Sequence, residues 1–322
     1  MIIITGASGF IGSNIFAAML KKKAFEQVVL CDWLGHADKW KNVANHQFDD
    51  FVFPENLKEY LEENKENLKM IIHMGAVSDT TETDADYTLA TNFHLSSQLW
   101  DFCADNEVRF IYASSAATYG DGSQGFNDLS IEGLRPLNPY GWSKHCFDQR
   151  VKKLTEYGIH HPKQWVGLKF FNVYGPNEYH KGGQRSVAHQ LYEQIQKDGK
   201  VQLFKPDPAL GAPRRDFIYV KDCVKVIEWF IDHPEESGIF NVGTGKARSF
   251  EDMAEACFKS LGKDPNIKHI DMPEHLVGKY QFHTEAAMGK LKKRGYAHKF
   301  YSLEEGIEDY YQNYLMTDNP YA

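Results

Sequence analysis

The fold is decided by a glycine-rich stretch near the start of the chain, which reads Thr5-Gly6-Ala7-Ser8-Gly9-Phe10-Ile11-Gly12. An apolar run over residues 2–5 predicts a strand before the glycines, and residues 11–23 predict a helix after them. Gly6 permits a tight turn, Gly9 lets backbone amides approach a pyrophosphate, and Gly12 lets the helix pack close to the sheet. Unpaired amide hydrogens and the positive end of the helix dipole favour an anion there. This context predicts a dinucleotide-binding unit rather than a glycine-rich turn without a ligand.

Short apolar runs alternate with longer amphipathic runs through the first half of the chain. Strands are predicted at residues 2–5, 27–31, 70–73, 109–114 and 165–170. Helices are predicted between them, at residues 11–23, 55–67, 85–106 and 140–157. Strands that alternate with helices form a parallel sheet covered on both faces. We therefore expect a doubly wound α/β fold of the Rossmann type.

The pattern loosens after residue 172. Prolines and a glycine cluster in residues 205–213 and predict a loop. Strands are expected at residues 216–220 and 239–242, and helices at residues 223–231 and 250–261. We expect a dinucleotide-binding domain of residues 1–170 plus segments near 216–242. Residues 171–215 and 243–322 would form a smaller mixed α/β substrate-binding lobe.

Composition excludes several classes of protein. The 322 residues have a net charge of -8 and a pI near 6.0, which argues against a nucleic-acid partner. The five cysteines include no CxxC pair, and the histidines show no compact ligand spacing, so we expect no disulfide framework and no metal. No apolar run reaches membrane-spanning length, and a strand directly after Met1 leaves no room for a presequence. The expected location is the cytoplasm.

An acidic residue bears on the choice of cofactor. Asp32 ends the second predicted strand, twenty residues beyond Gly12. A carboxylate there accepts hydrogen bonds from a ribose 2′-hydroxyl, which favours NAD, and it repels the 2′-phosphate of NADP unless a cation lies nearby. Lys39 is either that cation or an ordinary exposed lysine.

A tyrosine and a lysine form the predicted catalytic pair. Tyr140 and Lys144 are four residues apart at the start of a predicted helix, so both side chains lie on one helix face. A nearby ammonium group favours the phenolate form of the tyrosine, which can then remove a proton from an alcohol. Ser115 follows a predicted strand and would reach the carboxyl edge of the sheet, where it either hydrogen-bonds the reacting hydroxyl or caps a turn.

Taken together, these segments resemble the extended short-chain dehydrogenase/reductase family over nearly the whole chain. The motifs are TGASGFIG (5–12), HMGA (73–76), ASSAATYG (113–120), YGWSK (140–144), NVYGP (172–176), RRDFIYV (214–220) and NVGTG (241–245). Within the family, the segments FFNVYGPNEYHKG (170–182) and GKYQ (278–281) are most similar to a sugar-nucleotide epimerase. The resemblance implies an isomerase of carbohydrate metabolism that uses NADP, or else NAD, and that forms homo-oligomers.

The resemblance also implies residue roles. Catalysis would fall to Ser115, Tyr140, Lys144 and, as a second acid–base group, Lys181, which is otherwise a phosphate-binding or exposed lysine. The implied cofactor contacts are Gly6, Gly9, Phe10, Ile11, Gly12, Asp32, Trp33, Lys39, Met74, Gly75, Ala76, Val77, Ser78, Asn92, Tyr140, Lys144 and Val173. The implied substrate contacts are Ser115, Asn172, Lys181, Gly183, Gln190, Phe204, Arg215 and Tyr280.

Some positions depart from the family pattern, and other functions stay open. Pro54 or a neighbour replaces a further cofactor-binding lysine, Gln190 replaces a histidine, and Gly183 replaces a serine. Arg215 could instead form an ion pair with Asp216, and Phe204 and Tyr280 could be core aromatics. Ala116 and Ala117 follow Ser115 where dehydratases have an Asp-Glu pair, which disfavours dehydration. A UDP-hexose 4-epimerase remains an alternative, and a non-catalytic cofactor sensor is disfavoured because both Tyr140 and Lys144 are present.

Overall fold

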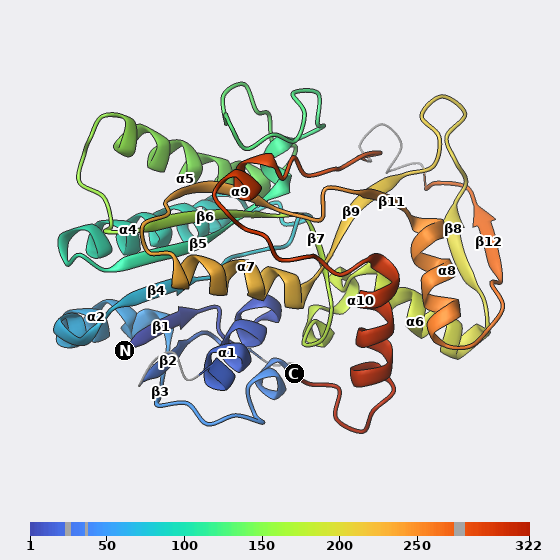
Figure 1. Ribbon diagram of the computed structural model, residues 1–322, viewed down its shortest axis with the longest axis horizontal. Coiled ribbons are helices and arrows are strands. Elements are labelled where there is room, and N and C mark those ends of the chain that lie inside the picture. Colours follow the sequence, from blue (N-terminus) through green and yellow to red (C-terminus); the bar gives the residue numbers. More distant parts are fainter. Residues whose placement is uncertain (23–26, 36–37, 274–280) are drawn as a thin grey trace.

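The structure, a computed structural model, describes residues 1–22, 27–35, 38–273 and 281–322. A large twisted sheet occupies one part of the molecule and has helices on both faces (Figure 1). Of two smaller sheets, one lies next to the large sheet and the other at the far end of the molecule. This arrangement agrees with the predicted Rossmann-type α/β fold.

The large sheet has seven strands, and all of its pairings are parallel. The strand order is β10-β6-β5-β4-β1-β2-β3, so the chain starts in the middle of the sheet and winds outward in both directions. The strands are β1 (Ile2–Thr5), β2 (Val28–Cys31), β3 (Asp50–Val52), β4 (Met70–His73), β5 (Arg109–Ser115), β6 (Trp165–Phe170) and β10 (Gly238–Val242).

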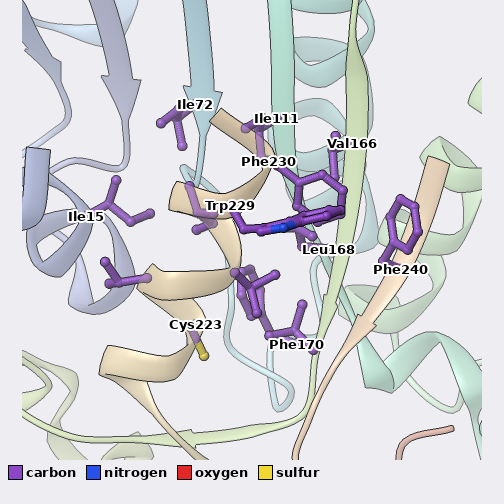
Figure 2. Close-up of a cluster of buried hydrophobic side chains, with 14 of the residues drawn as sticks. Ile15, Ile72, Ile111, Val166, Leu168, Phe170, Cys223, Trp229, Phe230 and Phe240 are labelled. Carbon is purple, nitrogen blue, oxygen red and sulfur yellow. The ribbon is translucent and has the colours of Figure 1, made fainter. Parts of the chain in front are cut away.

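Alternate side chains of the central strands enter two different cores. Ile2 and Ile4 of β1 pack with Phe16 of α1 (Phe10–Lys22), whereas Ile3 packs with Trp100 on the opposite face. Figure 2 shows the first of these cores, where α7 (Val220–Asp232) lies against side chains of the sheet. The ring of Phe230 is 4.9 Å from that of Phe240, centroid to centroid. Burial on both faces explains why these strands are mostly apolar.

Helices α4 (Leu95–Asp105) and α5 (Pro139–Glu156) cover the second face. The single helix predicted over residues 85–106 is interrupted: α3 (Ala85–Leu89) passes through a π-helical turn, Ala90–His94, into α4. A π turn inserts one residue into the helix and is frequent at functional sites. The helix predicted at 55–67 is likewise shorter, because α2 (Leu57–Asn64) lies between 3₁₀ turns.

The smaller sheets contain mainly elements that the sequence did not reveal. One consists of β11 (Ala247–Ser249), β9 (Arg214–Tyr219) and β7 (Asn172–Tyr174), and the other of β12 (Ile267–Ile270) and β8 (Val201–Phe204). The surrounding helices are α6 (Val187–Asp198), α8 (Phe250–Ser260), α9 (Gly289–Lys293) and α10 (Leu303–Tyr310).

The segment near residues 216–242 contributes to both parts of the molecule. Strand β10 extends the large sheet beside β6, and α7 covers one face of that sheet. Strand β9 instead pairs with β7 and β11. The division of the chain into a cofactor domain and a substrate lobe remains a prediction. Among the described residues, no helix has the length and apolar character needed to cross a membrane.

Candidate active site

A cleft of about 690 Å³ opens at the carboxyl edge of the large sheet. Residues at or just beyond the ends of five of its strands line the cleft, namely Thr5, Asp32, Met74, Ser115 and Phe170. Ligands of open α/β sheets bind at this edge, where the strand order reverses direction. The cleft therefore lies where the sequence predicted the cofactor.

The glycine-rich turn forms the floor of this cleft. Gly6 has a φ of +64°, and a Cβ atom there would lie 2.5 Å from the backbone nitrogen of Gly75. A Cβ atom on Gly12 would lie 2.1 Å from the carbonyl oxygen of Gly6. Helix α1 begins at Phe10, directly beside these backbone atoms. The turn thus has the close packing and the helix N-terminus that a pyrophosphate site requires.

Asp32 and Lys39 form an ion pair beside this turn. The Asp32 side chain is almost fully buried, and its Oδ2 accepts a hydrogen bond from the Ser8 amide at 2.9 Å. Its Oδ1 accepts from the Trp33 amide at 2.8 Å and from Lys39 Nζ at 2.7 Å. Lys39 also donates to the Trp33 carbonyl at 2.8 Å. Lys39 is therefore a partly buried cation at the cleft and not an ordinary exposed lysine.

Near Trp33, the residues of the cleft differ in charge from the family pattern. Pro54 lines the cleft, and the neighbouring Glu55 accepts a hydrogen bond from Trp33 Nε1 at 2.8 Å. Where the family pattern has a second lysine, this chain therefore has the pyrrolidine ring of Pro54 and the nearby carboxylate of Glu55.

Asn92 holds in place a loop that lines the cleft. Its side chain accepts a hydrogen bond from the Val77 amide at 2.8 Å and donates to the Val77 carbonyl at 2.9 Å. It also donates to Ser143 Oγ of α5 at 3.0 Å. Asn92 is buried in the π-helical turn and does not line the cleft, so it fixes the loop that does. The loop residues are Met74, Gly75, Ala76, Val77 and Ser78.

Tyr140 and Lys144 enter the cleft from the first turns of α5. Asn138 caps this helix by accepting a hydrogen bond from the Gly141 amide at 2.8 Å, and Pro139 occupies its first turn. Burial raises the pKa of Tyr140, and a hydrogen bond with the Ser115 hydroxyl opposes that rise. Burial lowers the pKa of Lys144 to about 8, against the charge of Asp148.

The sequence predicts that Lys144 lowers the pKa of Tyr140, but in the structure the net shift of this pKa is upward. The reason is that desolvation disfavours the phenolate more than the Ser115 hydroxyl favours it.

Lys181 reaches the same cleft from the second half of the chain. It lies in a 3₁₀ turn, Tyr179–Gln184, and its Nζ is 5.5 Å from the centroid of the Phe10 ring. Burial lowers the pKa of Lys181, and the carboxylate of Glu178 opposes that change. The structure therefore brings Ser115, Tyr140, Lys144 and Lys181 to one cleft.

Two asparagines that sequence analysis missed connect these loops. Asn42 Nδ2 donates to the Ser8 carbonyl at 2.8 Å and to the Asn177 carbonyl at 3.0 Å. Asn177 Nδ2 donates to Ser13 Oγ of α1 at 2.9 Å. The glycine-rich turn, the segment of Lys39 and the segment of Lys181 are thus joined. The family motif NEYH contains Asn177, but nothing in the sequence pairs it with Asn42.

Most of the predicted substrate residues lie outside the main cleft. Gln190 and Phe204 line a second cavity of about 170 Å³, together with Phe250. The Arg215 guanidinium lies 5.7 Å from the Phe250 ring centroid, close to this cavity. Gly183 is exposed, and Asn172 Oδ1 accepts a hydrogen bond from Thr284 Oγ1 at 3.3 Å. Tyr280 lies outside the described residues.

Asp216, the alternative partner for Arg215, has several other contacts. It accepts hydrogen bonds from the amides of Thr244 at 2.7 Å and Gly245 at 2.9 Å, and from the Thr244 hydroxyl at 2.6 Å.

Val173 lines the main cleft with Phe10 and Ile11. Among the described residues, no group of three or more His, Cys, Asp or Glu side chains could hold a metal ion.

The parallel sheet, the glycine-rich turn and the Tyr140–Lys144 pair at the sheet edge define a short-chain dehydrogenase/reductase of the extended type. The chain belongs to the NAD dependent epimerase/dehydratase family, whose model matches residues 2–243. It is 45% identical over 336 residues to the ADP-L-glycero-D-manno-heptose-6-epimerase of Fusobacterium nucleatum, with 100% of both chains covered. It is also 45% identical to the enzyme of that name from Nitratidesulfovibrio vulgaris, again over 100% of both chains.

Solved structures show the same likeness. The crystal structure of the Helicobacter pylori ADP-L-glycero-D-manno-heptose-6-epimerase superposes with a TM-score of 0.80 at 28% identity, covering 97% of this chain and 95% of that one. The Thermus thermophilus UDP-glucose 4-epimerase, solved with NAD, gives a TM-score of 0.73 at 23% identity, with 95% of this chain and 96% of that one covered. The latter likeness shows the fold alone.

Proposed function

We propose that this protein interconverts ADP-D-glycero-D-manno-heptose and ADP-L-glycero-D-manno-heptose by inverting carbon 6, a step that supplies precursors of the lipopolysaccharide core. The observation that supports this most is the presence of Tyr140 and Lys181, from different elements, in one cleft of a chain 45% identical over its full length to relatives of that name. Two acid–base groups allow proton transfer in either direction for each epimer.

The cofactor is a nicotinamide dinucleotide, and we propose NADP, with NAD as the alternative. The glycine-rich turn would hold the pyrophosphate, and Asp32, Trp33 and Lys39 would surround the adenosine ribose. Lys39 supports NADP because it places a cation beside the Asp32 carboxylate. When bound, the nicotinamide ring can accept a hydride from carbon 6 and return it, so no net oxidation occurs.

The chain's own residues would orient and deprotonate the sugar. Ser115 would donate a hydrogen bond to the carbon-6 oxygen and thereby hold the reacting hydroxyl beside Tyr140. Either Tyr140 or Lys181 removes the hydroxyl proton as carbon 6 is oxidised to a ketone. The other group protonates the ketone oxygen when carbon 6 is reduced on its opposite face. Charged Lys144 would favour the phenolate of Tyr140 and so offset the effect of burial.

The second cavity would hold the ADP end of the substrate. Phe204 offers a ring for the adenine, and the guanidinium fork of Arg215 matches the paired oxygens of a pyrophosphate. Gln190 lines the same cavity. By the family resemblance, Tyr280 would also contact the ADP part, and Asn172 and Gly183 would contact the substrate. In this arrangement residues 1–170, with segments near 216–242, bind the cofactor, and residues 171–215 and 243–322 bind the substrate. We also propose that the enzyme works in the cytoplasm as a homo-oligomer.

A substrate panel tests the proposal. Purified protein is incubated separately with each ADP-heptose epimer, UDP-glucose and UDP-galactose, and the products are separated by chromatography. We expect both heptose epimers to reach one common mixture while the UDP-hexoses stay unchanged. Conversion of the UDP-hexoses alone would replace this function with 4-epimerisation, and bound cofactor without any turnover would support a sensor.

The role of Lys181 needs its own variants. Lys181→Met should abolish epimerisation, because it removes one of the two acid–base groups and keeps a side chain of similar length. The matched control is Lys200→Met, which changes an exposed lysine after α6. Full activity with unchanged kinetics in the Lys181 variant would reject the two-group mechanism.

A further inference from the structure

We propose that Asp148, held by a buried ion pair with Lys169, is a positioning residue that keeps Lys144 charged and fixes α5 over the sheet. The inference rests on the proposed function in one respect, since it concerns the lysine that acts on Tyr140. Nothing in the sequence motifs assigns a role to either member of the pair.

Asp148 is fully buried and satisfied by contacts to two strands. Its Oδ2 lies 2.6 Å from Lys169 Nζ of β6 and accepts a hydrogen bond from Ser114 Oγ of β5 at 2.7 Å. Its Oδ1 accepts from Tyr112 OH of β5 at 3.0 Å. Three such donors hold the carboxylate in one orientation.

Lys169 extends the network to the turn that follows Ser115. It is as fully buried as Asp148, and its Nζ also donates to Thr118 Oγ1 at 2.6 Å. The Thr118 hydroxyl in turn donates to the Ser115 carbonyl at 2.8 Å. One continuous set of polar contacts therefore joins α5, β5, β6 and the backbone of the proposed catalytic serine.

The position of Asp148 on α5 relates it to the catalytic pair. Tyr140, Lys144 and Asp148 are spaced by four residues, so they form one stripe on the helix surface that faces the sheet. The carboxylate raises the pKa of Lys144, while burial lowers it. Other ionisable groups near this stripe are His73 of β4, which interacts with Lys144, and His145, which interacts with both members of the buried pair. Burial lowers the pKa of both histidines, and neither can carry a negative charge, so Asp148 is the anion that acts on Lys144.

Stability alone does not explain why a buried ion pair stands here in place of apolar residues. Replacing a buried ion pair with apolar residues of similar volume often leaves stability unchanged or improves it. The Asp148 carboxylate, which three donors fix one turn from Lys144, places a negative charge near the Lys144 amine, and an apolar pair could not do this. Without that charge, burial would favour the uncharged form of the amine.

The test uses variants that remove the charges together. Asp148→Asn alone leaves Lys169 buried and unpaired, so the double variant Asp148→Asn/Lys169→Met is the main reporter, with Lys169→Met as its partner. The matched control is Asp101→Asn/Arg150→Met, which removes an exposed ion pair between α4 and α5, 2.8 Å long. Two quantities are measured: the pH dependence of kcat, and the pKa of the Lys144 amine from the ¹³Cε shifts of labelled lysine, assigned with Lys144→Met.

We expect the double variant to lower the Lys144 pKa and the alkaline limb of kcat together, by about one pH unit. Lys169→Met alone, which leaves the Asp148 charge uncompensated, should move both in the opposite direction. The control pair should move neither. A double variant that loses activity while both quantities stay at their wild-type values would overturn the inference and leave a purely structural pair. A wild-type protein without epimerase activity would reject the proposed function instead, and the Lys144 titration would still decide the inference.

Discussion

Removing Lys39 should change the cofactor preference of the protein. Lys39 Nζ is 2.7 Å from Asp32 Oδ1, so Lys39→Ala changes the local charge beside the ribose from neutral to -1. A hydrogen bond to a charged group contributes about 1.5–3 kcal/mol, and a bound 2′-phosphate would lose one such contact. We therefore expect NADP affinity to fall by roughly tenfold to a hundredfold. NAD affinity should stay the same or rise slightly, because its 2′-hydroxyl can donate to the less occupied Asp32.

The assay is a pair of binding titrations on cofactor-free protein, with NADP and with NAD at one ionic strength. The quantity of interest is the ratio of the two dissociation constants, because a general loss of folding affects both cofactors alike. Lys41→Ala is the matched control, since Lys41 lies in the same 3₁₀ turn and forms an exposed ion pair with Asp38. A ratio that does not change in the Lys39 variant would refute the reasoning about the 2′-position.

Three further outcomes are expected. Gly12→Ala should lower the free energy of unfolding by about 1–3 kcal/mol or more, because its Cβ would lie 2.1 Å from the Gly6 carbonyl oxygen. Denaturant melts measure this, and a normal melt would contradict the close packing. Tyr140→Phe should lower kcat by about 10²–10⁴-fold while bound cofactor is retained by absorbance, and near-normal turnover would exclude Tyr140 as an acid–base group. Burial lowers the pKa of His73 to about 3. The unfolded chain therefore binds a proton that the folded chain does not, and stability should be complete above pH 6.5 and fall by up to roughly 5 kcal/mol toward pH 3. A His73→Gln variant with the same loss over that range would assign it to other groups.

The main features of the large sheet could be predicted from sequence because its strands are buried on both faces. Such strands are mostly apolar, and the bounds predicted for β1, β4 and β6 are those of the structure. Short or half-exposed strands lack this signal. Strand β3, with only Val52 buried, and β7, with only Tyr174 buried, were both missed.

In the candidate site, features within one short motif could be predicted, whereas contacts between distant parts of the chain could not. The glycines, Asp32 and the Tyr140–Lys144 pair belong to short motifs whose spacing reflects one turn or one helix face. The Asn42–Asn177 contact joins residues 135 positions apart, and sequence spacing contains no information on such a pair. The direction of the Tyr140 pKa shift could not be predicted from the sequence either, because it results from burial in the folded protein.

We propose that carbon 6 is inverted by removal and return of one hydride within a protein that retains its cofactor. The most direct measurement uses ADP-D-glycero-D-manno-heptose with deuterium at carbon 6, mixed with purified protein in ordinary water without added cofactor, and follows both epimers by NMR. We expect a mixture of the two epimers with deuterium still at carbon 6 in each. Exchange of the deuterium with solvent would contradict the hydride mechanism, and failure to form the second epimer, even with NADP or NAD added, would contradict the proposed function.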